Sequence, residues 1–151
     1  MIAVATPAGL LDAVGRDATA DGWFTVDQAR IDAFADASDD HQWIHVDPDR
    51  AAQGPFGSTV AHGYLTLALI PALTAGLVEV GGTGLVVNYG LDRVRFLQPV
   101  TAGSRIRAST TVRSAEPTPQ GVRVGFTVTI EIEGATRPAL VAETVVLYVA
   151  A

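Results

Sequence analysis

Residues 60–80, VAHGYLTLALIPALTAGLVEV, decide how this chain folds. The stretch begins with His62-Gly63 and then stays apolar on every side. A helix without a polar face must be covered all round by other elements, so we expect a buried helix that runs to about Val78. The later segments have strand character and are expected to wrap around it. The polar residues just before this helix then lie at its N-terminus, where we expect the functional site.

Composition limits the class of protein. The chain has 151 residues, which fits a single domain over 1–151, and no cysteine, which excludes disulfides, thiol catalysis and thiolate metal sites. The net charge of −6 argues against a nucleic-acid binder. No secretory signal is visible, and the apolar run from Leu65 to Val78 is shorter than the ~20 residues that span a bilayer. We therefore expect a cytoplasmic protein that contacts neither nucleic acid nor membrane.

The segment before the central helix predicts one more helix and a long ordered loop. Residues 23–26 are typical of a short strand, and an amphipathic helix is expected over 26–37, with Thr25 and Gln28 as a capping box. The loop over 39–59 contains one short helix, expected from Asp47 to Ala52. All three histidines lie in or beside this loop, and a loop of this length in a small domain is usually functional when it is ordered.

The segment after the helix reads as four strands joined by short turns. The expected ranges are 85–97 with a bend at Gly90, 105–114, 122–133 and 139–149. Short turns between consecutive strands imply an antiparallel sheet. With one helix buried on the concave face of that sheet, the fold class is α+β.

Asp40 and His45 are the candidate acid/base pair. They lie five residues apart in an ordered loop, so they can address one water molecule and share its protons. Gly63 follows 18 residues after His45, where a glycine lets a ligand approach the backbone and the free N–H groups of a helix start suit an oxygen that gains negative charge. Addition of water across an activated double bond requires this combination.

At these residues the sequence resembles the MaoC-like dehydratases, also called (R)-specific enoyl-CoA hydratases, and their nodulation-protein-N-like branch in particular. The family pattern is roughly Asp-x-Asn-Pro-x-His, then an acidic residue, alanines, and Ala-His-Gly at the start of the long helix. Asp40 and His45 match the catalytic Asp and His, Asp47 matches the acidic position, and Ala61-His62-Gly63 match the helix start. The resemblance covers residues 23–100 well.

The resemblance implies a hot-dog fold, which is a sheet wrapped around a central helix, and a homodimer whose sheets join edge to edge. It implies reversible hydration of a trans-2-enoyl-CoA to the (R)-3-hydroxyacyl-CoA, as in fatty acid metabolism, with no metal and no cofactor beyond the coenzyme A thioester. By this resemblance Asp40 and His45 activate the water, and the Gly63 N–H binds the thioester oxygen. Gln42 and His62 are supporting residues, and His62 is expected to orient the site rather than to react.

The chain departs from the family pattern at Gln42-Trp43, which replaces Asn-Pro. Proline fixes the backbone φ angle, so the loop must be held in another way, and packing of Trp43 is one candidate. This departure bears on loop geometry and substrate range.

Other interpretations remain open at this point. His41 and His45 are four residues apart and could hold a metal from a helix. A hot-dog thioesterase usually carries a carboxylate on the central helix, and His62 to Val78 contains none. A non-catalytic acyl-thioester-binding module would follow if Gln42-Trp43 had spoiled the site.

Residues outside the motif give weaker predictions. Tyr64 and Asn88-Tyr89 are expected to pack in the core rather than to line an acyl tunnel. Three arginines, Arg93, Arg95 and Arg105, are possible partners of coenzyme A phosphates, although solvated strand faces are the simpler interpretation.

Overall fold

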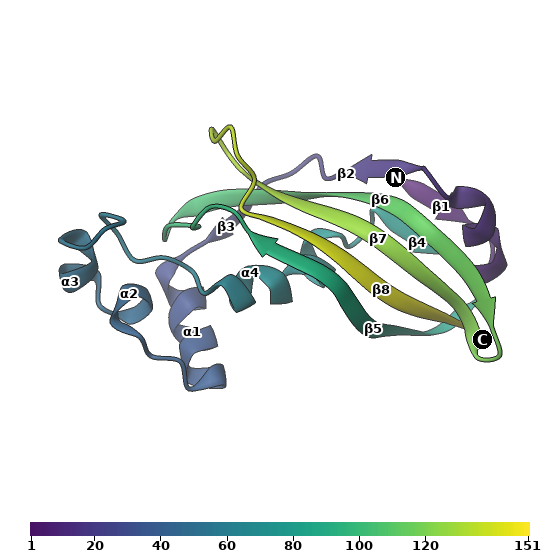
Figure 1. The fold of residues 1–151 in the computed structure, drawn as a ribbon, viewed down its shortest axis with the longest axis horizontal. Helices are drawn as coiled ribbons and strands as arrows, with labels where there is room; N and C mark the ends of the chain where they lie inside the picture. Colours follow the sequence, from purple (N-terminus) through teal and green to yellow (C-terminus); the bar gives the residue numbers. More distant parts are fainter.

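A curved antiparallel sheet dominates the computed structural model, which describes residues 1–151 (Figure 1). Its strands are ordered β2-β6-β7-β8-β5, and β3 also pairs with β6. Their bounds are Asp17–Thr19 (β2), Phe24–Val26 (β3), Thr83–Phe96 (β5), Ser104–Thr118 (β6), Gly121–Ile132 (β7) and Leu140–Ala150 (β8). The predicted antiparallel sheet and α+β class are confirmed, and the register shift between Asn88 and Gly90 lies at the predicted bend.

Alternating side chains place one face of this sheet in the core. In β7, Val124, Phe126, Val128 and Ile130 are all buried, as the period of two in a strand requires. They belong to one hydrophobic cluster of 25 residues. The β6 strand is longer than predicted and continues through Pro117 to Thr118, so the turn to β7 is tighter than the sequence indicated.

The central helix is shorter than predicted. It consists of α4 (Gly63–Ala68) and α5 (Ile70–Leu73), and its continuation to Val78 is wrong. Pro71 has no N–H to donate inside the helix, and Gly76 turns the chain away with a φ of 76°. The chain then forms β4 (Val78–Val80), which pairs in parallel with β1 (Ile2–Val4), a small sheet that the sequence did not indicate.

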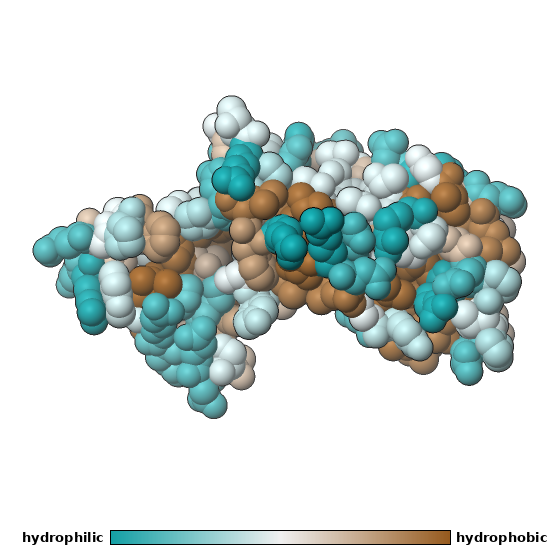
Figure 2. All heavy atoms as spheres, in the orientation of Figure 1, coloured by the Kyte–Doolittle hydropathy of each residue, from teal (hydrophilic) through white to brown (hydrophobic).

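The sheet covers only one side of this helix. Leu65, Thr66 and Ile70 are buried, whereas Tyr64 is 71% exposed. The neighbouring edge strand, β5, is exposed along most of its length and presents apolar side chains, including Leu85, Val86, Val87, Tyr89, Leu91 and Phe96. Figure 2 shows apolar surface over the region of β5 and β8, interrupted by hydrophilic residues. One face of the helix and the adjacent sheet edge therefore lack a cover within this chain.

Three helices form a lobe beside the sheet (Figure 1). They are α1 (Gln28–Ser38), α2 (Trp43–Val46) and α3 (Pro48–Ala52). The cap of α1 is Asp27, whose carboxylate accepts from the Arg30 N–H, so the predicted capping role of Thr25 is wrong. The chain begins with β1 and the 3₁₀ helix η1 (Pro7–Ala13). No helix in the structure has the length and apolar character needed to cross a membrane.

Candidate active site

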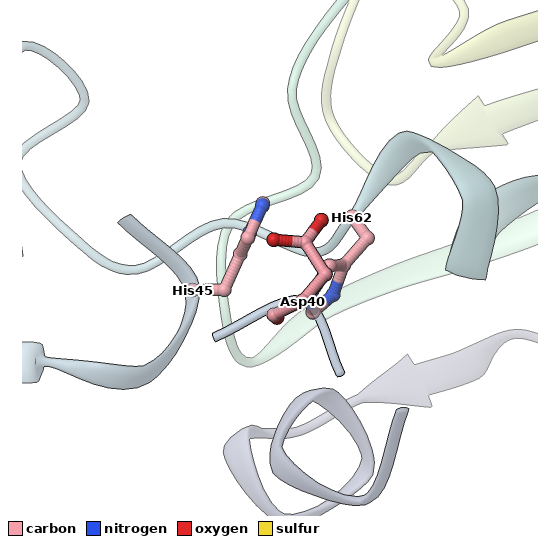
Figure 3. Close-up of side chains that lie close together, drawn as sticks. All are labelled: Asp40, His45 and His62. Carbon is pink, nitrogen blue, oxygen red and sulfur yellow. The ribbon is translucent and has the colours of Figure 1, made fainter. Parts of the chain in front are cut away.

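Asp40, His45 and His62 lie together where the lobe meets the start of α4 (Figure 3). One carboxylate oxygen and one ring nitrogen from each histidine all lie within 4.8 Å of one another. The carboxylate of Asp40 points towards the two imidazole rings. The structure thus brings together the Asp, the His and the helix-start His that the sequence singled out.

The Asp40 loop is shaped by the end of α1. Asp39 ends the helix in the left-handed conformation with a φ of 57°, and it is the one residue other than glycine with a positive φ. The next residue, Asp40, is exposed, and its Oδ1 accepts from the Gln42 N–H at 3.4 Å. The backbone carbonyl of Asp40 accepts a hydrogen bond from His62 Nε2 at 2.9 Å. The carboxylate therefore keeps lone pairs for a water or a substrate.

His45 is held in one tautomer. Its Nδ1 lies 2.6 Å from the carbonyl oxygen of Val60, and because a carbonyl can only accept, Nδ1 carries the proton and Nε2 keeps a free lone pair. Burial lowers the pKa of His45 below its usual value, and the nearby His62 lowers it further, whereas the Val60 hydrogen bond and Asp40 act in the opposite direction. His45 is thus a neutral imidazole with a basic nitrogen available, as a general base requires.

His62 supports the pair by packing. Its ring stacks on that of His45 with centroids 3.7 Å apart and an interplanar angle of 22°. The centroid of the Phe34 ring lies 4.9 Å from that of His62. The side chain is buried, and its Nδ1 has no hydrogen-bond partner. Because its Nε2–H also holds the Asp40 backbone, this is the arrangement expected of an orienting residue.

Gly63 lies on a cavity of about 310 Å³ that His45 also lines. As the first residue of α4 it has no acceptor for its N–H inside the helix. Phe96 packs against it, and a Cβ at this position would come within 3.1 Å of the Phe96 ring. His45 and the first residue of α4 therefore line one cavity, whose lining residues do not include Asp40.

Trp43 holds the loop where the family pattern has proline. Its ring packs on Gly54, where an added Cβ would come within 3.0 Å, and the Arg50 guanidinium lies 4.4 Å from the ring centroid. The Gln42 side chain is exposed and takes part in none of the hydrogen bonds of the structure, so Gln42 contributes through its backbone. Asp47 caps α3 by accepting from the Arg50 N–H.

The structure does not form the metal site that the sequence suggested for His41 and His45. His41 bonds Asp36 of α1 at 2.8 Å and lies outside the Asp40 cluster, so the His41–His45 metal pair does not form. The three clustered residues are of types that bind metals as well as of types that transfer protons. Two of their four imidazole nitrogens are engaged by backbone carbonyls, and His62 Nδ1 is buried without a partner.

The residues that the sequence singled out outside the motif lie on the surface. Arg105 is paired with Glu133, and Arg95 bonds the carbonyl of its neighbour Val94. Tyr64, Asn88 and Tyr89 are exposed rather than packed in the core, which contradicts the expectation for all three. The sequence reasoning also missed the acceptor for His45 Nδ1, because a backbone carbonyl gives no sequence signal.

Comparison with known families and relatives agrees with this geometry. Residues 10–133 match the model of the MaoC-like domain. The 3-hydroxyacyl-thioester dehydratase Z of Mycobacterium tuberculosis (strain H37Rv) is 49% identical over 144 residues, which is 95% of each protein. Nodulation protein N of Rhizobium leguminosarum bv. viciae is 46% identical over 85% of this chain and 82% of its own length.

Solved structures show the same fold. The R-hydratase PhaJ1 from Pseudomonas aeruginosa superposes with a TM-score of 0.73 at 25% identity and covers 91% of this chain and 83% of that one. The (R)-hydratase from A. caviae involved in PHA biosynthesis gives a TM-score of 0.68 at 25% identity, with 89% and 95% covered. The fold is therefore the hot-dog fold predicted from the sequence.

Proposed function

The chain belongs to the MaoC-like dehydratase family, and we propose on that basis how its site works. The protein is a hydro-lyase that interconverts a 3-hydroxyacyl thioester and the trans-2-enoyl thioester by removing or adding water. Asp40 and His45 are the acid/base pair, and the Gly63 N–H binds the thioester oxygen. The observation that carries the proposal is the hydrogen bond from His45 Nδ1 to the Val60 carbonyl, which leaves a neutral Nε2 beside the Asp40 carboxylate.

Hydration follows from this arrangement. A water held between His45 Nε2 and the Asp40 carboxylate loses a proton to the pair as its oxygen bonds to C3 of the enoyl thioester. The electron pair of the C2–C3 double bond moves towards the thioester oxygen, and the enolate is stabilised by the Gly63 N–H. The protonated member of the pair then returns the proton to C2, so that one water is added and the pair is regenerated.

We propose a coenzyme A thioester as substrate, the (R) configuration for its hydroxyl group, and neither a metal nor a redox cofactor. Activation of the double bond comes from the thioester carbonyl itself, so the reaction needs only the acid/base pair and a donor to that oxygen. The helices α4 and α5 carry no Asp or Glu, so they lack the carboxylate expected of a hot-dog thioesterase.

The acyl chain has an apolar space beyond the site. A cavity of about 670 Å³ lies between the central helix and the sheet, bounded by Leu67 and Ala68 on one side and Phe126 and Val128 on the other. It begins about one helical turn beyond Gly63. We expect Ala68→Phe to reduce turnover of dodecenoyl-CoA more than that of crotonyl-CoA. An unchanged ratio of the two rates would place the chain elsewhere.

We propose further that residues 1–151 act as one domain and that two copies pair through β5. The support is the exposed apolar side chains of this edge strand and the uncovered face of the helix beside it. Long apolar edge strands are rarely left free, because their unpaired backbone groups recruit another strand. Pairing of two β5 edges would continue the sheet from one copy to the other.

The function is tested by the loss of enoyl-thioester absorbance when protein is added to crotonyl-, octenoyl- or dodecenoyl-CoA. We expect hydration by the wild type, and turnover lower by about 10²–10⁴ in Asp40→Asn and in His45→Ala, as for loss of a general acid or base. Asp39→Asn is the matched control, since it removes the neighbouring carboxylate. Near-normal turnover in folded Asp40→Asn would remove Asp40 from the mechanism, and no hydration by the wild type at any chain length would favour a binding module.

A further inference from the structure

Gln28 joins the two segments that hold His45. Its Nε2 donates to the backbone carbonyl of His45 at 2.7 Å, and its Oε1 accepts from the hydroxyl of Thr59. Thr59 precedes Val60, whose carbonyl accepts the hydrogen bond from His45 Nδ1. The Gln28 amide therefore bonds to the His45 backbone and to the residue before Val60, which are the two segments joined by the His45–Val60 hydrogen bond.

The segment carrying His45 depends on such contacts for its position. The helix α2 has four residues, and a single helical turn has little stability of its own. The carbonyl of His45 lies in its last turn, where carbonyls lack intrahelical donors. Besides the His45 side chain itself, its links to the neighbouring segment include the bond from the Val60 N–H to the Ile44 carbonyl at 3.0 Å and the bridge through Gln28.

Gln28 itself is fixed to the core. It is the first residue of α1, next to the Asp27 cap, and its Nε2 also donates to Asp32 Oδ1 at 2.7 Å. The helix is anchored by Ile31 and Ala35, which are fully buried. The amide thereby connects a rigid helix to the catalytic turn.

We propose that Gln28, through Thr59, is the positioning residue that holds the His45 imidazole against the Val60 carbonyl. The residue type matters, because the amide offers both the donor for the His45 carbonyl and the acceptor for the Thr59 hydroxyl. Glutamate has the same shape but presents two acceptors, so it loses the bond to the His45 carbonyl. The kinetic test of this inference rests on the proposed function. The spectroscopic test does not, because it measures the His45 tautomer directly.

The kinetic test compares Gln28→Glu with Gln120→Glu, an exposed glutamine in the β6–β7 turn that gives the same change of charge. We expect Gln28→Glu to lower kcat for crotonyl-CoA by about 10- to 100-fold, as for a misplaced catalytic group, with KM within about threefold because no substrate contact is lost. Thr59→Val should lower kcat in the same direction, and Thr59→Ser should restore it.

The spectroscopic test reads the tautomer of His45 from its imidazole ¹⁵N shifts. The wild type should show protonated Nδ1, and Gln28→Glu should show a mixture of tautomers while Gln120→Glu does not. An unchanged tautomer and an unchanged kcat in folded Gln28→Glu would overturn the proposal, as would a loss confined to KM. If the wild type failed to hydrate any enoyl-CoA, the tautomer measurement would still decide the role of Gln28, so the two failures are distinguishable.

Discussion

Replacement of Gly63 by proline removes one N–H and leaves the backbone path intact. Proline is well accepted at the first position of a helix, since the N–H there has no intrahelical acceptor. The preceding residue, His62, has φ −56° and ψ 138°, which is the extended region that a residue before proline prefers. Gly63→Pro is therefore a test of the proposed donor to the thioester oxygen.

Gly63→Ala is the matched control. Alanine keeps the N–H but adds the same Cβ, which meets the Phe96 ring at 3.1 Å. Phe96 is 48% exposed, so it can move by the few tenths of an ångström needed. We expect Gly63→Ala to lose no more than about fivefold in kcat. Gly63→Pro should lose a further 10²–10³-fold, about 2.7–4 kcal/mol of transition-state stabilisation, as measured for a single oxyanion-hole donor.

The assay is the initial rate of crotonyl-CoA hydration by the wild type and both variants, with thermal unfolding measured alongside. Both variants carry the Cβ, so the difference between them reports the loss of the N–H together with the ring carbon that replaces its hydrogen. If the two variants agree in kcat within about threefold while both remain folded, the Gly63 N–H does not bind the oxygen that gains charge. Another donor would then have to be sought around the cavity.

Three further predictions concern pH, stability and assembly. The acid limb of kcat/KM for hydration should lie below pH 6.5, because the lowered pKa of His45 keeps it neutral and able to accept a proton until the pH falls below that pKa; a limb above pH 6.5 would contradict this. Gly121→Ala should lower the free energy of unfolding in urea by about 2–4 kcal/mol, since its Cβ would lie 2.1 Å from a backbone oxygen of β8. Gly22→Ala, which adds a Cβ in open space at a residue without a positive φ, should cost less, and equal losses would refute the steric argument. Val87→Asp in β5 should give a monomer by light scattering, whereas Thr19→Asp on the opposite edge strand should not; a dimer in both would place the interface elsewhere.

The sequence predicted the parts of the fold that repeat or carry a motif. The alternation in 122–133 gave the β7 strand, and Asp47-Pro48 gave the start of α3. The helix end was missed because the apolar run from Leu65 to Val78 does not show where a buried helix stops and a strand begins. The small parallel sheet was missed because its three-residue strands are far apart in the chain and have no signal of their own.

The sequence indicated which residues lie together and missed the hydrogen bonds that hold them. Asp40, His45 and His62 cluster in the structure as the motif suggested, and their catalytic roles are the proposal made above. The hydrogen bonds that hold them come from the Val60 carbonyl and the Gln28 amide, which depend on the tertiary path of the chain. Gln28 did attract notice in the sequence, but as part of a helix cap, because capping is a local pattern and bridging two distant segments is not.

The packing of Trp43 has a practical consequence for spectroscopy. The chain contains two tryptophans, and the other, Trp23, lies beneath the Arg107 guanidinium at 4.6 Å. A Trp23→Phe variant would leave a single fluorophore two residues from His45, wedged between Gly54 and a cation. Its emission would report directly on the environment of the loop that carries Asp40 and His45. Acyl-CoA titrations and stopped-flow traces could then follow events at the proposed site without any attached label.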